Sequence, residues 1–404
     1  MKALFLTNEY PPHVYGGAGV HVDYLSRELA KSMPIEVRCF GEQRFDGGNL
    51  HVRGYEADAA ECTCPQPLRS VFGAVQRCTN FNTANIDADV VHCHTWYSHF
   101  GGILAKMNYG LPLVITLHSL EPLRPWKRDQ LGGGYDFTVW LEKTALEMAD
   151  AVIAVSAGTK QDLLRLFNIT AERLHVIPNG IDLAEYRKVS TTAALKRFGI
   201  DREKPFLLFV GRITRQKGIN HLVRAIEHMA DGFQIVLCAA APDTPEIARE
   251  MEQAIREASA KRKGVIWIRE MLDKPTMIEL YSHAAVFCCP SIYEPFGIIN
   301  LEAMACETAV VASAVGGIKE VVVDGETGFL VPLEQMKESF EPKNPAQFER
   351  DLAMRIDELM ADPEMRSRFG RAGRKRAAEK FGWPAIAAQT KQLYETLQKR
   401  QPAG

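Results

Sequence analysis

Two glutamates frame the segment E-P-F-G-I-I-N-L-E at residues 294–302. The apolar run V-F-C-C-P precedes it, so Glu294 is predicted in a loop at the carboxyl end of a strand, with a helix starting near Gly297. Glu302 then lies about one and a half turns into that helix. A carboxylate there can accept two hydrogen bonds from a vicinal diol such as ribose. A carboxylate in the loop can accept hydrogen bonds from sugar hydroxyls or stabilise a developing positive charge.

The backbone between these two acids adds a third element. The N–H groups of the helix's first turn would point at a phosphate placed between the carboxylates. One short segment would then hold both ends of a nucleotide-sugar. In the alternative interpretation, Glu294 is an N-terminal acid that complements the helix dipole and Glu302 is a solvated helix residue. The spacing by itself favours neither interpretation.

Basic residues crowd a second turn, F-V-G-R-I-T-R-Q-K-G-I at 209–219, which again leads from a strand to a helix. The guanidinium of Arg212 and the ammonium of Lys217 would neutralise a diphosphate there through charge-assisted hydrogen bonds, with Arg215 beside them. A solvated basic turn is the alternative. Because a helix dipole disfavours cations at a helix N-terminus, the sequence favours a function for these charges.

Glycines follow the first predicted strand, in Y-P-P-H-V-Y-G-G-A-G-V-H at 10–21. Gly16 and Gly17 immediately precede an apolar-periodic helix, where backbone N–H groups can approach an anion closely. The spacing is not G-x-G-x-x-G, and no acidic residue stands where a nicotinamide-dinucleotide site would have one. The turn is therefore either a phosphate cradle or a tight turn that packs a strand on a helix.

A histidine and a basic loop follow the run P-L-V-I-T-L-H, which ends at His118. Judged alone, a histidine at a strand end is more often structural than catalytic. The loop beyond it carries Arg124, Lys127 and Arg128, which suit an anionic ligand. A cluster of surface charges is an equally good interpretation of these three residues.

The elements that must position these motifs are short apolar runs that alternate with longer amphipathic segments, a pattern typical of β-α units around parallel sheets. The first series of predicted strands covers 3–7, 35–40, 89–94, 112–118, 151–156 and 174–178. A polar stretch near 182–204 follows, and a second series covers 206–211, 234–240, 265–268, 286–290 and 309–313. The motifs above fall at the carboxyl ends of these strands, where ligands of such sheets bind.

We therefore predict an α/β protein with two Rossmann-like, doubly wound parallel-sheet domains that face each other across a cleft. The first domain is predicted over 1–185 and the second over 186–384, with P-N-G-I-D at 178–182 as the hinge entry. A C-terminal helix over 385–404 is predicted to pack back on the first domain, because F-G-W-P at 381–384 interrupts the helical pattern.

The composition agrees with this organisation and excludes several classes of function. At 404 residues the chain exceeds the about 250–300 at which a single core stops growing. No stretch approaches the about 18 consecutive apolar residues of a membrane span, and the formal net charge of −2 attracts no nucleic acid, so we predict neither partner. The nine scattered cysteines and the lack of a signal-peptide pattern predict reduced thiols and a cytoplasmic location. His92, Cys93 and His94 look like metal ligands, but neighbouring strand residues point to opposite faces, so we predict no metal site.

Together these motifs resemble those of a known family. The E-P-F-G-I-I-N-L-E segment resembles the E-x7-E motif of retaining GT-B glycosyltransferases, which many sugar transferases share. Longer segments resemble the actinobacterial-type glycogen synthases, a group that includes α-maltose-1-phosphate synthases: D-V-V-H-C-H-T-W-Y, S-L-E-P-L-R-P-W-K and S-I-Y-E-P-F-G-I-I-N-L-E-A-M-A. The likeness extends across essentially the whole chain, and S-L-E-P-L-R-P-W-K is its most specific portion.

The resemblance implies roles for individual residues. The family's donor site matches Gly16, Gly17, Arg212, Lys217, Glu294, Phe296, Gly297, Ile298 and Glu302. Glu294 would contact the transferred glucose, Glu302 the ribose, and Arg212 with Lys217 the diphosphate. The family's active-site histidine matches His118, so the implied catalytic residues are His118, Arg212, Lys217 and Glu294. Classical bacterial and plant enzymes carry a lysine two residues before the paired glycines, where this chain has Val14, which leaves more charge compensation to the other cations.

The resemblance also implies a reaction, which is retaining transfer of glucose from ADP-glucose to a 4-hydroxyl in glycogen or α-glucan biosynthesis. The acceptor is glucose 1-phosphate or the end of an α-1,4-glucan, with Arg124, Lys127 and Arg128 as candidate acceptor residues. No cofactor or metal is implied, and UDP-glucose is the alternative donor. Two rival interpretations stay open: a non-catalytic glucan-binding or regulatory protein on the same scaffold, and a UDP-sugar transferase with another acceptor. The oligomeric state also stays open, with a homodimer among the arrangements.

Overall fold

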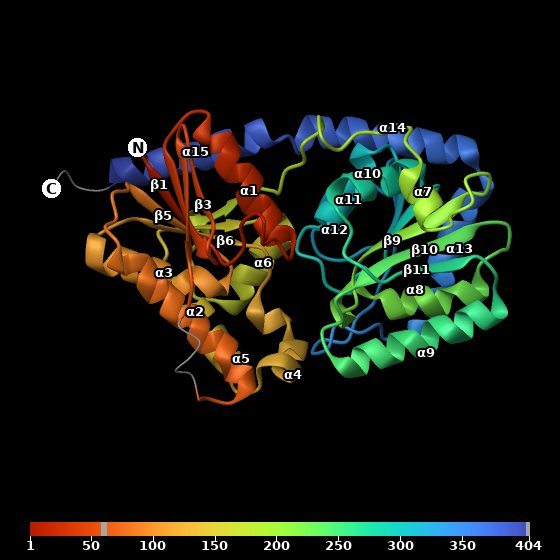
Figure 1. The fold of residues 1–404 in the computed structure, drawn as a ribbon, viewed down its shortest axis with the longest axis horizontal. Coiled ribbons are helices and arrows are strands. Elements are labelled where there is room, and N and C mark those ends of the chain that lie inside the picture. Colours follow the sequence, from red (N-terminus) through yellow and green to blue (C-terminus); the bar gives the residue numbers. More distant parts are fainter. Residues whose placement is uncertain (58–62, 401–404) are drawn as a thin grey trace. The chain divides into compact units, whose positions relative to one another are not determined.

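The computed structural model describes residues 1–57 and 63–400 and divides the chain into two compact units (Figure 1). The first unit is Met1–Gly180 with Trp383–Gly404, and the second is Ile181–Gly382. The predicted boundaries fall slightly later, after residues 185 and 384. The difference arises because the segment that begins at Ile181 already bonds to the second unit, where its N–H donates to the carbonyl of Phe381 at 2.8 Å.

The first unit contains an eight-stranded sheet in the order β3-β4-β2-β1-β5-β6-β7-β8. All neighbouring strands are parallel except β3 and β4, which pair antiparallel at the edge. The strands are β1 (Ala3–Leu6), β2 (Ile35–Phe40), β3 (Arg44–Gly47), β4 (Leu50–Tyr55), β5 (Val90–His94), β6 (Leu113–Leu117), β7 (Ala151–Ala154) and β8 (Leu174–Val176). The longer helices are α1 (Gly17–Ala30), α2 (Gln66–Thr83), α3 (Trp96–Tyr109), α5 (Gly134–Met148), α6 (Ala157–Leu166) and α15 (Trp383–Arg400). Short helical turns, η2 (Glu121–Leu123), η3 (Pro125–Lys127), α4 (Arg128–Leu131) and η4 (Ala171–Arg173), connect them.

The last helix, α15, completes the core of the first unit and packs on α1 (Figure 1). Trp383 stacks on Tyr24 of α1 with ring planes 3° apart, and Ile386 and Tyr394 are fully buried in the same core. The predicted helix over 385–404 therefore begins at Trp383, and its last four residues, 401–404, lie outside the described residues.

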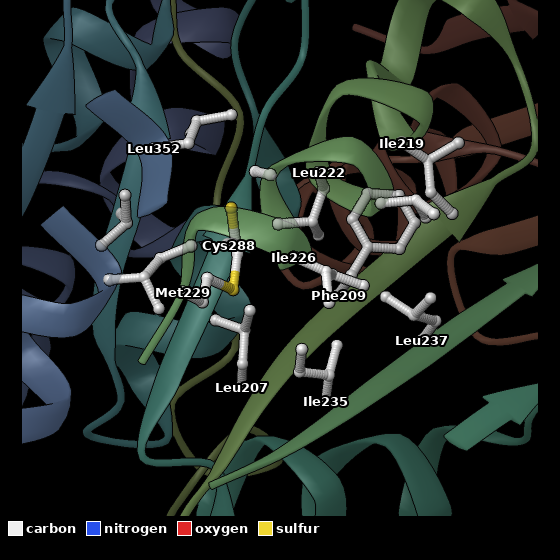
Figure 2. Close-up of a cluster of buried hydrophobic side chains, with 14 of the residues drawn as sticks. Leu207, Phe209, Ile219, Leu222, Ile226, Met229, Ile235, Leu237, Cys288 and Leu352 are labelled. Carbon is white, nitrogen blue, oxygen red and sulfur yellow. The ribbon is translucent and has the colours of Figure 1, made fainter. Parts of the chain in front are cut away.

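The second unit contains a six-stranded parallel sheet in the order β11-β10-β9-β12-β13-β14. Its strands are β9 (Phe206–Arg212), β10 (Gln234–Ala240), β11 (Val265–Ile268), β12 (Val286–Cys289), β13 (Ala309–Ser313) and β14 (Gly328–Val331). Its helices are α7 (Ala193–Arg197), α8 (Ile219–Ala225), α9 (Pro245–Lys261), α10 (Lys274–His283), α11 (Ile298–Ala305), α12 (Ile318–Val321), α13 (Pro345–Ala361) and α14 (Pro363–Lys380), with turns η5 (Arg215–Lys217) and η6 (Ile226–His228). Figure 2 shows part of the core, where Leu207 and Leu237 from the sheet meet Leu222 and Ile226 from the helical side.

The predicted parallel sheets are confirmed, and the predicted strands match to within two residues at each end. Their continuous apolar runs are buried because helices cover both faces of a parallel sheet. The sequence analysis missed β3, β4 and β14. All four residues of β3 are exposed and β4 alternates apolar with polar residues, so neither contains the apolar run that marks a buried strand.

Two further observations concern the cysteine side chains and the apolar character of the helices. The eight cysteines in the described ranges are free thiols, and Cys62 lies outside those ranges. Among the helices of residues 1–57 and 63–400, none has the length together with the apolar character that crossing a membrane requires.

We expect Tyr394→Phe to destabilise the first unit, because the Tyr394 hydroxyl lies 2.5 Å from Nδ1 of the fully buried His92. His92 Nε2 is occupied by Thr116 Oγ1 at 2.7 Å, so the variant would leave one buried ring nitrogen without its partner. Such a loss costs about 1–3 kcal/mol in the free energy of unfolding, measurable in urea. Glu395→Gln, on the exposed side of the same helix, should change it by less than about 0.5 kcal/mol. Equal stability of the two variants would contradict this prediction.

Candidate functional site

The strand order of the second unit reverses between β9 and β12, which are neighbours in the sheet but not in the sequence. In open parallel sheets such a reversal leaves a crevice beyond the carboxyl ends of the two strands, where ligands bind. Arg212 is the last residue of β9, and Lys217 ends the turn that follows it. Glu294 lies in the loop after β12, and Glu302 lies in α11. The fold therefore places all four predicted side chains at one edge of one sheet.

Lys217 and Glu294 form a direct ion pair at this edge. Lys217 Nζ lies 2.7 Å from Glu294 Oε2, and only 17% and 10% of the two side chains are exposed. The Thr214 hydroxyl accepts a hydrogen bond from the Lys217 N–H and fixes the turn, and the Ser291 hydroxyl donates to Glu294. In a largely buried pair of this kind, water screens the charges less, so they act more strongly on a ligand.

Glycines allow the loops that carry this pair to approach each other. Gly218 has φ +62°, and a Cβ atom there would lie 1.9 Å from the carbonyl oxygen of Pro290. A Cβ at Gly316 would lie 2.1 Å from the carbonyl oxygen of Glu294. Two backbone hydrogen bonds join the same loops, Ile292 N to Gln216 O at 2.9 Å and Gly317 N to Glu294 O at 3.0 Å. No side chain other than hydrogen fits at Gly218 without moving a backbone.

The N-terminus of α11 lies between the two predicted acids. Gly297 precedes the helix with φ +96°, and no side chain caps this end in the described structure. Phe296 is buried against Phe381 at a ring distance of 5.7 Å, whereas Ile298 is half-buried. The amides of the first turn therefore stand where the sequence analysis places the phosphate and the sugar, with Glu294 before them and Glu302 after them.

Glu302 is held by two tyrosines that the sequence analysis did not identify. The Tyr186 hydroxyl donates to Oε1 at 3.1 Å, and the Tyr281 hydroxyl donates to Oε2 at 2.9 Å. Burial raises the pKa of the Glu302 carboxyl, and the hydrogen bonds from Tyr281 and Tyr186 act in the opposite direction. Tyr186 and Tyr281 are far from Glu302 in the sequence, and no local pattern marks either residue.

Arg212 has a carboxylate partner that was also missed. Its Nη1 lies 3.1 Å from Asp243 Oδ1, and 10% of the Asp243 side chain is exposed. Asp243 follows the end of β10, so its position at the carboxyl end of a strand was a signal that could have identified it. Arg215, by contrast, pairs with Glu250 at 3.6 Å on the surface and does not join the other cations.

In the first unit, the glycine turn already binds an anion, the carboxylate of Glu9. Glu9 Oε2 accepts hydrogen bonds from the N–H groups of Tyr15 and Gly16, both at 2.8 Å. Helix α1 begins at Gly17 and has no acidic residue in its first turn, so Glu9 supplies the negative charge there. The two amides of the turn are thus occupied by a side chain of the protein itself.

His118 follows β6 and lies among other histidines. Its Nε2 is 3.3 Å from Nδ1 of His94, and the ring centroid of His21 is 4.7 Å away. Burial lowers the pKa of His118 well below its usual range, so the imidazole is neutral and can accept or donate a hydrogen bond.

Among the described residues, His21, His94 and His118 form a group that could hold a metal ion, because their candidate ligand atoms all lie within 4.8 Å of one another. Neighbouring nitrogens around tetrahedral zinc lie about 3.4 Å apart, since each Zn–N bond is about 2.0–2.1 Å. His94 and His118 already contact each other through one nitrogen each. His94 and His118 are thus already at about the spacing of two zinc ligands, and His21 contacts them through ring packing, with neither of its ring nitrogens hydrogen-bonded in the described structure.

The basic loop of the first unit does not form one shared anion site. Lys127 is buried, and its Nζ lies 3.0 Å from Oε1 and 3.1 Å from Oε2 of Glu121. Arg124 Nη1 lies 3.5 Å from the same carboxylate. Arg128 instead pairs with Asp136 on the exposed surface. Burial lowers the pKa of Lys127 to about 8, and Glu121 compensates its charge. Arg124 is the more exposed of the two inward-facing cations.

We expect Gly218→Ala to destabilise the second unit far more than Gly199→Ala. Both glycines have nearly the same φ, +62° and +66°, but a Cβ at Gly199 would meet nothing within 4 Å. The Gly199 variant should therefore lose only the about 1–2 kcal/mol of a left-handed conformation. The Gly218 variant should lose at least about 3 kcal/mol in the free energy of unfolding, because the Pro290 backbone must move. Similar losses in urea unfolding would show that the close approach is not a constraint.

Comparisons with known proteins identify the family of the chain. The Glycosyltransferase Family 4 model matches residues 15–185, and the Glycosyl transferases group 1 model matches residues 190–376. The chain is 46% identical to an alpha-maltose-1-phosphate synthase of Mycolicibacterium smegmatis, over 98% of this chain and 100% of that one. It is 45% identical to the enzyme of the same name from Mycobacterium tuberculosis, again over 98% of this chain and 100% of the other.

A solved structure extends the likeness to the fold. The sucrose-phosphate synthase of Thermosynechococcus elongatus superposes with a TM-score of 0.80 at 26% identity, covering 99% of this chain and 100% of that one. The GT-B fold and the resemblance found in the sequence are confirmed. The chain belongs to the GT-B glycosyltransferases, in the family that contains the alpha-maltose-1-phosphate synthases.

Proposed function

We propose that the protein transfers glucose from ADP-glucose to the 4-hydroxyl of glucose 1-phosphate, which yields α-maltose 1-phosphate with retention at the anomeric carbon. The observation that carries this proposal is the Lys217–Glu294 pair at the reversal of the strand order, in a chain 46% identical to an enzyme of that name. The pair places a cation that can bind a diphosphate 2.7 Å from a carboxylate that can accept hydrogen bonds from sugar hydroxyls.

The chemistry requires that the departing diphosphate be stabilised. The bond from the anomeric carbon to the phosphate oxygen breaks, and a bond from the same carbon to the acceptor's 4-oxygen forms on the same face. The acceptor's proton passes to the departing phosphate oxygen, so no protein base is needed. Lys217, Arg212 and the amides at the N-terminus of α11 supply fixed positive charge where the negative charge develops.

The free protein keeps these cations paired, and the donor takes over the pairing. Lys217 is bonded to Glu294 and Arg212 to Asp243. When a diphosphate binds between them, it offers oxygens to both cations, and Glu294 is released to accept hydrogen bonds from the glucose hydroxyls. This rearrangement accompanies binding, so both cations already face the diphosphate when the bond breaks.

An α-1,4-glucan end is the second candidate acceptor. It is favoured by one observation, that Glu121 already neutralises Lys127 and that Arg128 pairs with Asp136. A neutral acceptor would need none of the loop cations, whereas glucose 1-phosphate would use Arg124. A panel that offers both acceptors with both donors, ADP-glucose and UDP-glucose, separates the candidates.

We expect the panel to give one new phosphorylated disaccharide from ADP-glucose and glucose 1-phosphate, with two α-anomeric centres in its proton NMR spectrum, one in the new glucosidic bond and one bearing the phosphate. Glycogen should be extended more slowly at equal concentration of acceptor ends. Faster extension of glycogen would assign the glucan as acceptor, and a β-anomer would overturn retention. No ADP or UDP release with any acceptor would favour the non-catalytic interpretation.

We expect Lys217→Met to lower kcat/KM for the donor by about 10²–10³-fold, because it removes one fixed charge from the departing diphosphate. Lys261→Met is the matched control, since Lys261 forms an exposed pair with Glu227 in the same unit. The control should stay within about twofold of the wild type. Rates are measured as nucleoside diphosphate released. A Lys217 variant as active as the control would remove the clamp from the mechanism.

A further inference from the structure

The carboxylate of Glu302 receives one hydroxyl on each of its oxygens from two separate elements. Tyr281 belongs to α10 and is fully buried, and its hydroxyl lies 2.9 Å from Oε2. Tyr186 belongs to the segment that enters the second unit and is 6% exposed, and its hydroxyl lies 3.1 Å from Oε1. Glu302 itself is only half-buried, so part of its surface stays open to a ligand.

The direction of these two hydrogen bonds follows from the ionisation of the groups. Burial, with the nearby charge of Glu302, raises the pKa of Tyr281 well above its usual range, so its hydroxyl keeps its proton and donates. An ionised carboxylate is only an acceptor. Burial raises the pKa of Glu302, and the two hydroxyls lower it, so they favour the ionised acid.

The remaining charges near Glu302 are engaged elsewhere. Lys274 and Lys217 both lower its pKa, but Lys274 pairs with Glu185 at 2.8 Å and Lys217 pairs with Glu294. The thiol of Cys306 is protonated, because burial raises its pKa to about 12. Arg374 donates to the backbone carbonyls of Tyr186 and Ala305 rather than to the carboxylate. In the described residues, the tyrosine hydroxyls are thus the direct donors to Glu302.

The lone pairs that remain define what Glu302 can bind. A carboxylate has about four acceptor positions, and the two tyrosines occupy one on each oxygen. One position per oxygen is left, which matches two adjacent hydroxyls of one sugar ring. A protonated Glu302 would present one donor and could no longer accept from both hydroxyls.

We propose that Tyr186 and Tyr281 are positioning residues that orient Glu302 and keep it ionised, so that its carboxylate accepts from the vicinal diol of the donor's ribose. This inference rests on the proposed function, because it assumes a nucleotide donor in this half of the protein. Neither tyrosine contacts the donor in this scheme, and each acts through the acid.

The test uses the full-length protein and measures equilibrium binding of ADP by calorimetry, which requires no transfer reaction. Tyr186→Phe should weaken ADP binding about tenfold, the loss expected when one hydrogen bond to a charged group disappears. It should also move the acid side of the binding profile to higher pH, because removal of a donor raises the pKa of Glu302 further. The sign follows because the bound diol needs the ionised acid, which is lost as the pH falls through that pKa.

A second probe separates positioning from general damage to the fold. Wild-type protein should bind ADP more tightly than 2′,3′-dideoxy-ADP, and Tyr186→Phe should lose most of that preference. Glu302→Gln should lose both the preference for ADP over 2′,3′-dideoxy-ADP and the decrease in ADP binding at low pH. Tyr109→Phe is the matched control, because it removes an exposed tyrosine hydroxyl from the first unit, where it donates to the carbonyl of Asn82.

The outcomes distinguish the two hypotheses. If the protein binds neither ADP nor UDP, the proposed function fails. If it binds ADP, but Tyr186→Phe keeps the wild-type affinity, acid profile and preference for the diol, the tyrosines have no positioning role and this inference is wrong. Tyr281→Phe provides an independent variant on the other oxygen, with the same expected directions.

Discussion

The site depends on one close approach of backbone to backbone. β9 and β12 are parallel neighbours, so the turn after one strand and the loop after the other open on the same edge of the sheet. Gly218 permits contact between them because it presents no Cβ to the Pro290 carbonyl. That contact brings Lys217 within 2.7 Å of Glu294, and the loop then leads directly into α11 and Glu302. The position of Lys217 beside Glu294 therefore depends on the absence of a side chain at residue 218.

In the part of the chain that the structure describes, the cations and glycine-turn amides singled out from the sequence in each unit have partners within that same unit. Asp243 holds Arg212, Glu294 holds Lys217, and in the first unit Glu9 holds the amides of the glycine turn. Half-buried charges without partners would be costly, since they lose hydration without compensation. Internal pairing keeps the binding groups stable and oriented before a ligand arrives. Under the proposed function, the donor diphosphate replaces internal carboxylates, so affinity depends on the difference between two sets of contacts.

Local patterns in the sequence predicted the elements that carry continuous apolar runs and the residues that stand at their ends. Arg212, Lys217, Glu294 and Glu302 were found because each follows or ends such a run. Their partners were not found, because Tyr186 lies 116 residues from Glu302, and such pairing is created by the fold. The basic loop shows the converse. Three cations close in sequence are separated in the structure, because Lys127 turns inward to Glu121 and Arg128 turns outward to Asp136.

The return of the chain to the first unit has a consequence for its biosynthesis. α15 supplies six residues, Trp383, Ile386 and Tyr394 among them, to a core whose other members come from the first 180 residues. A ribosome makes those earlier residues first, yet the apolar face of α1 and the ring of His92 lack their covering until the last helix emerges. The second unit has all of its strands and helices before that moment. The first unit therefore cannot complete its core until the residues of the second unit have been translated.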